Sequence, residues 1–190
     1  MLDLSPLFAS DLVYLAPPDR EGDAEIVARW YEDPEFAPLV QRGPAYPLKI
    51  EEARRKLPAA ENDPNRFVFA IRLKEDSRLA GLIEVGKILW PIGVGWLSLQ
   101  IGDTRDRRKG YGSQALALML RYAFNELNLN KIISLVNGYN QPALKFFKKN
   151  GFAQEVRQRE ALLRGHQRWD LIWMGLTRAE WEAGSAGGLR

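Results

Sequence analysis

The chain contains no cysteine, only one histidine and no long apolar run. Without cysteine it has no disulfides, no thiolate metal ligands and no cysteine nucleophile. No apolar stretch approaches the roughly 18 residues of a membrane-spanning helix. The first fifteen residues include acidic side chains but no lysine or arginine, unlike the positively charged start of a secretory signal peptide. We therefore expect a cytoplasmic protein that has no membrane partner.

The length and charge of the chain suit one domain of ordinary composition. Its 190 residues are 46% hydrophobic and 27% charged. We expect a single domain over residues 1–183. Residues 184–190 are rich in glycine and have little to bury, so they are predicted to form a disordered tail. The formal net charge of +3 is too small to indicate a nucleic-acid partner by itself.

Hydrophobic periodicity predicts an α/β (α+β) fold, in which strands come in succession first and alternate with helices later. Alternating and β-branched segments predict strands at 12–17, 66–73, 78–90, 94–103, 131–137, 152–164 and 167–176. Apolar residues at helical spacing predict helices at 23–33, 49–58, 111–127, 141–150 and 177–183.

A basic segment that ends in glycines precedes the third of these helices. Arg105, Arg107, Arg108 and Lys109 come directly before the "GYG" of residues 110–112. A helix N-terminus presents unpaired N–H groups and partial positive charge, and glycine lets a ligand approach the backbone. The segment therefore predicts a site for phosphate or pyrophosphate, with a solvated basic loop as the alternative.

Two widespread phosphate motifs do not fit this segment. The P-loop pattern GxxxxGK[ST] is absent. "GYGSQA" matches the loose dinucleotide pattern G-x-G-x-x-A, but residues 103–109 separate it from the preceding strand. The following strand ends in asparagine rather than in the acidic residue that binds a ribose. The dinucleotide interpretation is therefore disfavoured.

Two other patterns fit the chain much better. Arg107, Gly110 and Gly112 form R-x-x-G-x-G, and "NQPALKFFKKNGF" at 140–152 forms N-x-x-A-x-x-x-[YF]-x-x-x-G-F. Together they resemble the two signatures of the GNAT superfamily of N-acetyltransferases. The resemblance extends over most of the chain. Within the superfamily, the chain is similar to the branch of ribosomal-protein and spermidine acetyltransferases. It implies a mixed, mostly antiparallel central sheet of about six to seven strands, flanked by about four helices.

The resemblance also implies acetyl-CoA as co-substrate and no metal. In the superfamily, the strand before the glycine loop splays from its neighbour, and its free backbone groups hold the pantetheine arm and the thioester carbonyl. Amides of the glycine loop would bind the pyrophosphate. Asn140 would contact the pantetheine or cap the next helix. The implied cofactor-binding residues are Leu99, Gln100, Ile101, Arg107, Arg108, Lys109, Gly110, Tyr111, Gly112, Ser113, Asn140 and Phe147.

Direct attack of an amine on the thioester needs a neutral amine, so a general base is useful. Glu84 is the candidate, because it lies mid-strand in "LAGLIEVG", where a cleft lined by Ala80 and Leu82 would suit it to accept a proton. The alternatives are an exposed strand residue and a structural ion pair. His166 lies beside Gly165 in a predicted turn and is interpreted as a surface residue.

One position departs from the superfamily pattern. Phe147 stands where many members have a tyrosine whose hydroxyl protonates the leaving thiolate, and phenylalanine has no proton to give. Three interpretations are open. The thiolate leaves unaided, since a thiol pKa is near 8.5; another group donates the proton; or the chain is a catalytically inactive acyl-CoA-binding module.

The acceptor is expected to be a primary amine, either of a small molecule or of a protein N-terminus. The segment "YEDPEF" carries Glu32, Asp33 and Glu35, which would attract a cationic amine or are simply solvated. A monomer or a homodimer is expected. A basic domain for RNA or anionic lipid is a further alternative, although the arginine cluster lacks the interleaved aromatic residues that stack bases.

Overall fold

The structure is a computed structural model and describes residues 7–57 and 63–186. Its centre is a seven-stranded sheet in the order β1-β2-β3-β4-β5-β7-β6. Neighbouring strands are antiparallel, except that β4 and β5 are parallel. The strands are β1 (Val13–Ala16), β2 (Phe67–Leu73), β3 (Leu79–Leu89), β4 (Val94–Ile101), β5 (Lys131–Asn137), β6 (Ala153–Arg164) and β7 (Gln167–Thr177).

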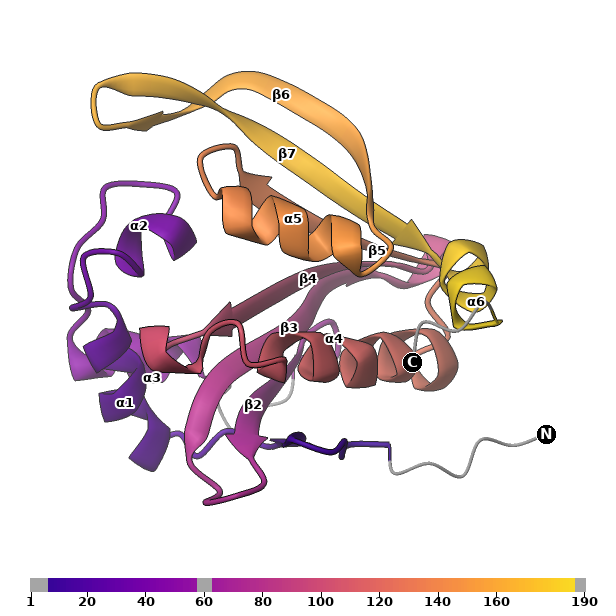
Figure 1. Ribbon diagram of the computed structural model, residues 1–190, viewed down its shortest axis with the longest axis horizontal. Helices are drawn as coiled ribbons and strands as arrows, with labels where there is room; N and C mark the ends of the chain where they lie inside the picture. Colours follow the sequence, from indigo (N-terminus) through magenta and orange to yellow (C-terminus); the bar gives the residue numbers. More distant parts are fainter. Residues whose placement is uncertain (1–6, 58–62, 187–190) are drawn as a thin grey trace.

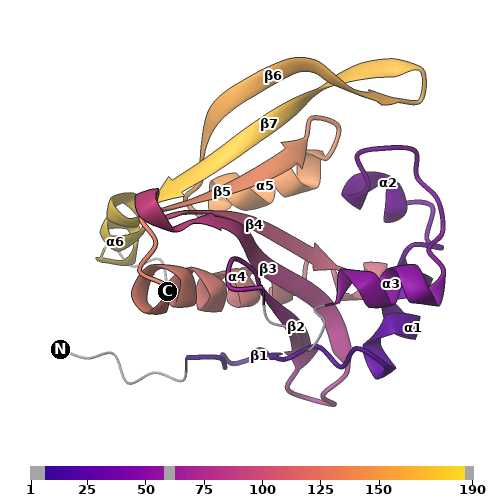
Figure 2. The same ribbon diagram turned by 180° about the vertical axis from the view of Figure 1, so that it is seen from behind.

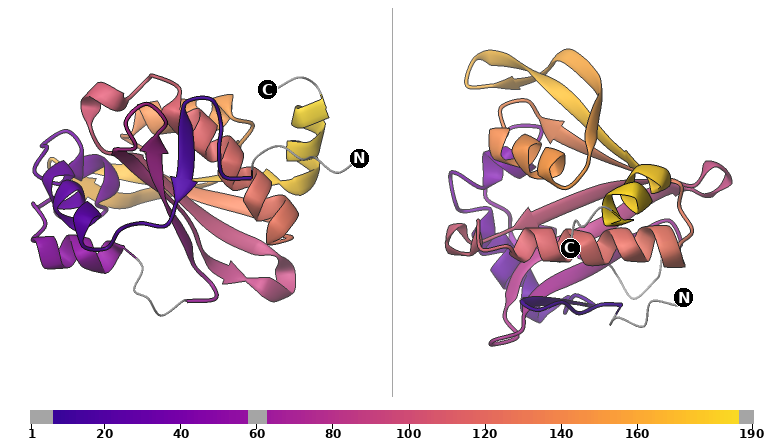
Figure 3. Two further views of the ribbon diagram at one scale, coloured as in Figure 1. Left: turned by 90° about the horizontal axis from the view of Figure 1, so that it is seen from below. Right: turned by 45° about the vertical axis from the view of Figure 1, so that its right-hand side comes forward.

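Helices cover both faces of this sheet (Figures 1 and 2). Two of them, α4 and α5, pack on one face, and α1, α2 and α3 gather on the other. Figure 3 shows α6 beside the end of α4, where the rings of Phe124 and Trp181 lie 5.2 Å apart. The helices are α1 (Gly22–Trp30), α2 (Ala37–Val40), α3 (Ile50–Lys56), α4 (Tyr111–Arg121), α5 (Gln141–Lys149) and α6 (Arg178–Ala186).

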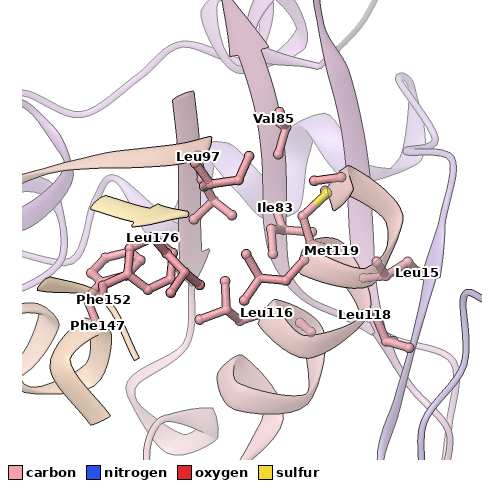
Figure 4. Close-up of a cluster of buried hydrophobic side chains, with 14 of the residues drawn as sticks. Leu15, Ile83, Val85, Leu97, Leu116, Leu118, Met119, Phe147, Phe152 and Leu176 are labelled. Carbon is pink, nitrogen blue, oxygen red and sulfur yellow. The ribbon is translucent and has the colours of Figure 1, made fainter. Parts of the chain in front are cut away.

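The larger hydrophobic cluster lies between α4, α5 and the sheet. Helix α4 presents the apolar stripe that its sequence predicts, and Leu116 and Met119 are fully buried. Figure 4 shows these two side chains beside Ile83 of β3 and Leu97 of β4. Burial of such side chains stabilises the fold by about 1.5–3 kcal/mol each. The cluster therefore fixes α4, and with it the glycine-rich start of that helix, against β3 and β4.

The smaller cluster joins α1, α2 and α3 to the opposite face. Trp30 of α1 is buried and lies over Gly102, immediately after β4. A Cβ atom on Gly102 would lie only 1.9 Å from Cε2 of Trp30, so a side chain cannot be accommodated there without displacing the ring. This close approach packs α1 against the end of the strand that leads into the glycine loop.

A buried ion pair connects α1 to β2. The carboxylate of Asp23 is 3% exposed, and both of its oxygens accept from NH2 of Arg72, at 3.0 and 2.8 Å. Oδ2 also accepts from the N–H of Asp19 at 2.8 Å. A buried charge is tolerated when its hydrogen bonds are satisfied in this way. The pair therefore holds the first helix in a fixed position on the sheet.

The mixed, mostly antiparallel sheet is confirmed, and each predicted strand lies within three residues of its observed bounds. Two helical expectations need correction. The connection that follows α1 contains the short helix α2, in which Pro38 occupies an early position where a missing N–H costs nothing. The last helix continues to Ala186 rather than ending at Ala183. Residues 187–190 of the expected tail lie outside the described residues, and the single domain over 1–183 stays a prediction.

We expect Asp23→Asn to lower the free energy of unfolding by about 3 kcal/mol, because it leaves the partly buried Arg72 without its counter-charge. Urea denaturation measures this directly. Glu25→Gln is the matched control, since Glu25 pairs with Arg29 at 3.6 Å where both side chains are more than half exposed. Such a pair contributes less than about 1 kcal/mol. Equal effects of the two substitutions would contradict the structural role of Asp23.

Candidate active site

A gap between β4 and β5 forms the main cleft of the protein. The two parallel strands pair only over Val94–Trp96 and Lys131–Ile133 and then separate. Beyond that point β4 stays paired with β3, and β5 stays paired with β7, so each keeps one partner and has one free edge. The cleft has a volume of about 320 Å³. This is the splayed strand pair that the sequence resemblance implies.

The cleft passes through the sheet from one face to the other. Ser98 and Gln100 of β4 lie in register with Glu84 and Leu82 of β3, on the face covered by α1–α3. The intervening Leu99 lies on the opposite face, towards α4 and α5. All five residues line the cleft. The cleft therefore has two walls of different composition, here called the α1–α3 wall and the α4–α5 wall.

Backbone hydrogen bonds show which groups of β4 face the gap. The N–H of Gly102 donates to the carbonyl of Ala80 in β3 at 3.0 Å. Since backbone groups alternate along an antiparallel strand, Gln100 also directs its backbone towards β3. Leu99 and Ile101 therefore direct their N–H and C=O groups into the gap. Of the predicted segment 99–101, Gln100 contributes a side chain to the cleft rather than backbone donors.

The glycine-rich start of α4 lies at one end of this gap. Gly110 has φ of 90°, a left-handed conformation that glycine adopts without strain. The first intrahelical bond runs from the N–H of Gln114 to the carbonyl of Gly110, so the amides of Tyr111, Gly112 and Ser113 have no intrahelical acceptor. A Cβ on Gly112 would lie 3.6 Å from the side chain of Leu99. These amides can therefore receive an anion next to the α4–α5 wall.

The cations of the glycine loop have separate environments. Arg105 pairs with Asp103 at 2.7 Å, and hydrogen bonds from Arg105 lower the pKa of Asp103 to about 2. Lys109 lies 4.0 Å from the buried carboxylate of Asp106. Within the described part of the chain, Arg108 is the member of the cluster that makes no ion pair. Its φ of 63° places it in the left-handed region just before the glycines.

Arg107, the arginine of the R-x-x-G-x-G pattern, directs its side chain away from the gap, and its predicted contact with the cofactor stays a prediction. Its guanidinium donates to the carbonyl of Gly102 at 3.2 Å and lies 3.8 Å from the carboxylate of Asp33. It also lies over the ring of Phe36, 5.7 Å from the centroid. These contacts direct the side chain towards α1 and α2. Arg107 is therefore a positioning residue for the glycine loop.

A buried carboxylate anchors the same loop to the sheet. Asp106 is 2% exposed, and its Oδ1 accepts from NH2 of Arg78, just before β3, at 2.7 Å. The hydrogen bond to Asp106 raises the pKa of Arg78. The loop between β4 and α4 is thus tied down on two sides, by Arg78 and by Arg107. Rigid positioning of this kind is what an amide cradle for an anion needs.

Residues of the second signature lie at the α4–α5 wall. Asn140 lines the cleft, and its Oδ1 accepts from the N–H of Ala143 at 3.1 Å, which caps α5. Phe147 is 6% exposed and lines the cleft. Its ring packs against Phe152 with centroids 5.0 Å apart. Phe146 is half-buried, and its ring lies 3.6 Å from the Cβ position of Gly112.

Glu84 lines the α1–α3 wall as part of an ion pair. Its Oε1 accepts from Nε of Arg66 at 3.1 Å, and its Oε2 accepts from NH2 at 3.0 Å. The hydrogen bond to Glu84 raises the pKa of Arg66. The ion pair was one of the alternatives that the sequence left open. Leu82 lines the cleft beside Glu84 as expected, whereas Ala80 belongs to the hydrophobic core.

Other candidate groups lie away from the cleft. His166 is exposed in the β6–β7 turn, as expected. Tyr139 donates its hydroxyl to the carbonyl of Pro38 at 2.8 Å and accepts from Nδ2 of Asn137, so it is engaged with the loop beside α2. Within residues 7–57 and 63–186, no three histidine, cysteine or acidic side chains are grouped to hold a metal ion. No helix in these ranges is long and apolar enough to cross a membrane.

Several cleft residues were not found by sequence reasoning. They are Tyr31, Arg42, Lys56, Arg66 and Ser134. Ser134 had a local signal, because it interrupts the apolar strand "KIISLVN" and is 3% exposed. The other four come from separate segments that only the folded chain brings together.

The chain combines a gap between parallel strands, a glycine-rich helix start beside it and a signature helix on its wall, as expected of an acetyl-CoA-dependent transferase. The family model for the acetyltransferase (GNAT) domain matches residues 13–153. The chain belongs to the GNAT family, and it is an acetyl-CoA-dependent N-acetyltransferase.

Relatives and solved structures agree with this assignment. The uncharacterized N-acetyltransferase YnaD of Bacillus subtilis is 28% identical over 119 residues, which are 62% of this chain and 68% of YnaD. The spermidine N(1)-acetyltransferase of Escherichia coli is 27% identical over 152 residues, 80% of this chain and 73% of that protein. The spermidine N-acetyltransferase of Vibrio cholerae, solved with CoA and spermine, has the same fold, with a TM-score of 0.78 at 19% identity over 90% of this chain and 98% of that chain.

We expect acetyl-CoA to raise the melting temperature of the wild-type protein in a saturable way, because a ligand at 100 times its Kd stabilises the native state by about 2.7 kcal/mol. Gly112→Trp should lose this shift, since the indole would fill the space in front of the α4 amides. Gly112→Ala is the folding control, because its Cβ makes only ordinary contacts at 3.6 Å and beyond. A full shift in the tryptophan variant would contradict the placement of the anion cradle.

Proposed function

We propose that the enzyme transfers the acetyl group of acetyl-CoA to a primary amine by direct attack in a ternary complex assembled in the β4–β5 gap. The observation that carries the proposal is that this gap opens onto both walls of one cleft, while Gly112 at the start of α4 lies against the side chains of Leu99 and Ile101 of β4. Acetyl-CoA occupies the α4–α5 wall, and the acceptor approaches from the α1–α3 wall. The two substrates then meet at the free edge of β4.

The backbone of β4 supplies the proposed electrostatic stabilisation. As the nitrogen attacks, the thioester carbonyl oxygen gains negative charge. Backbone N–H groups of Leu99 and Ile101 face the gap, and a donor held in place there stabilises that charge. The amine first loses one proton to solvent and attacks as the neutral species; the C–N bond forms, the C–S bond breaks and CoA leaves as a thiolate. The nitrogen, now an ammonium, gives up one further proton and keeps one hydrogen as the amide N–H. The amides of Tyr111 to Ser113 hold the pyrophosphate throughout.

The proton balance needs an acceptor for the ammonium proton. Glu84 is the one carboxylate among the described residues that line the cleft. We propose that it receives this proton, directly or through water, while Arg66 fixes its orientation. The thiolate leaves without a tyrosine, since a thiol pKa near 8.5 makes it a tolerable leaving group. The Ser134 hydroxyl lies on the same wall as Phe147 and can donate a hydrogen bond to the leaving thiolate.

The remaining assignments concern nucleic-acid binding, the cellular compartment and the oligomeric state. We propose no nucleic-acid partner, because Arg105, Arg107 and Lys109 of the basic cluster each lie within 4.0 Å of a carboxylate. We propose the cytoplasm as the compartment, on the sequence features described above. A monomer or a homodimer stays a prediction.

We expect Glu84→Gln to lower kcat about 100-fold, the usual contribution of a general base, with a small change in melting temperature. Arg66→Met is the companion variant, because it removes the partner and retains the carboxylate. If Glu84 is the base, Arg66→Met lowers kcat less than Glu84→Gln does, because it retains the carboxylate and removes only the residue that orients it. If the ion pair is only structural, both variants lose stability to the same extent and keep kcat. Steady-state kinetics by thiol release and thermal melts separate the two results.

A further inference from the structure

The acceptor side of the cleft carries an excess of positive charge. Three cations, Arg42, Lys56 and Arg66, line the cleft together with one carboxylate, Glu84. Three positive charges and one negative charge leave a net charge of +2. Arg66 donates two hydrogen bonds to Glu84, and this bidentate pair neutralises one of the three positive charges. Arg42 and Lys56 therefore account for the excess.

Neither of these two cations has a carboxylate partner within the described part of the chain. Nζ of Lys56 lies 5.2 Å from the ring centroid of Tyr31. Partial burial, and then repulsion from Arg66, lower the pKa of Lys56. Glu52 and Glu84 act in the opposite direction with smaller effects, and an anion bound beside Lys56 would favour its charged form.

Arg42 is held in place by the far end of the chain. NH2 of Arg164, in the β6–β7 hairpin, donates to the carbonyls of Gln41 and Gly43, at 2.6 and 2.7 Å. These are the residues on either side of Arg42. Figure 1 shows the β6–β7 hairpin extending past β5, with its turn on the same side of the molecule as α2. Arg164 therefore fixes the loop that presents Arg42.

A neutral donor lies in the same wall. Tyr31 is 4% exposed and lines the cleft. Burial, with a smaller effect of Tyr46, raises the pKa of Tyr31 to about 12. The hydroxyl stays protonated at neutral pH and can donate a hydrogen bond to an anion.

The acidic segment that was expected to attract a cationic amine does not line the cleft. Asp33 accepts from Thr104 at 3.2 Å and from the N–H of Glu35 at 2.8 Å, and it also lies near Arg107. Glu32 and Glu35 are exposed. Apart from Glu84, the described lining therefore offers no carboxylate for the second ammonium group of a polyamine.

We propose that the acceptor is a small primary amine that also carries a carboxylate, with the carboxylate bound by Arg42 and Lys56 and the nitrogen directed to the β4–β5 gap. The proposal deepens the acetyl transfer described above and rests on it. It distinguishes this chain from the Vibrio cholerae enzyme, whose solved complex contains spermine. Two cations and a tyrosine hydroxyl match one carboxylate, whereas a polyamine would bring further positive charge to a positive wall.

Three amines with the same five-carbon chain test the proposal: 5-aminopentanoate, pentylamine and 1,5-diaminopentane. They differ in bearing a carboxylate, a methyl group or a second ammonium group at the far end. We expect kcat/KM, measured by thiol release, to fall at least tenfold from the first to the second and further to the third. A preference for the diamine, or equal values for all three, would overturn the proposal.

Charge-removing variants identify the residues involved. Lys56→Gln and Arg42→Gln should each reduce the preference for 5-aminopentanoate over pentylamine about tenfold, through a higher KM for 5-aminopentanoate. Lys74→Gln is the matched control, because Lys74 is an exposed lysine in the β2–β3 turn. An unchanged preference in both cleft variants would overturn the assignment of these two cations.

The closing measurements keep this proposal separate from the proposed reaction. If acetyl-CoA does not raise the melting temperature of the wild-type protein in a saturable way, the proposed reaction itself is refuted. If acetyl-CoA binds but no amine reacts, calorimetry on the CoA-loaded protein decides the acceptor class. Tighter binding of 5-aminopentanoate than of pentylamine would support a carboxylate-bearing acceptor, and equal or weaker binding would overturn that proposal.

Discussion

The limited pairing of β4 with β5 is the constraint on which the site depends. Three residue pairs join the strands, and then each follows its own outer neighbour. Sheet hydrogen bonds that would normally be made are left open, and that cost is tolerated because the core clusters on both faces hold the strands in place. The free edge of β4 is thus a built-in binding surface, and the glycine loop that follows it is placed at its end.

Ion pairs act mainly as positional restraints around this gap. Asp106 holds the glycine loop to Arg78, and Arg107 holds it to the first helices. Glu84 and Arg66 orient one another at the acceptor wall. Such pairs add modestly to stability, because desolvation offsets much of their attraction. Their geometric effect is greater, since a catalytic cleft needs groups held within a fraction of an ångström.

Local patterns predicted the fold well because they depend on neighbouring residues. Strand β5 has the predicted bounds, and α4 begins at the predicted glycines. The acceptor wall was not predictable in this way. The Arg66–Glu84 pair depends on cross-strand register, and the contact of Arg164 with the loop at 41–43 spans more than a hundred residues. For the same reason, the motif did not predict that the side chain of Arg107 contacts Asp33 and Phe36, near α1 and α2.

The two walls of the cleft come from different parts of the chain. Most lining groups on the acceptor side belong to the α1–α3 region, β2 and β3, whereas lining groups on the cofactor side belong to β5 and α5. Strand β4 is the boundary between them. Substitutions before β4 can therefore alter the acceptor while the machinery for the common co-substrate stays intact. An architecture divided in this way allows new acceptor specificities to evolve mainly by change in the first half of the chain.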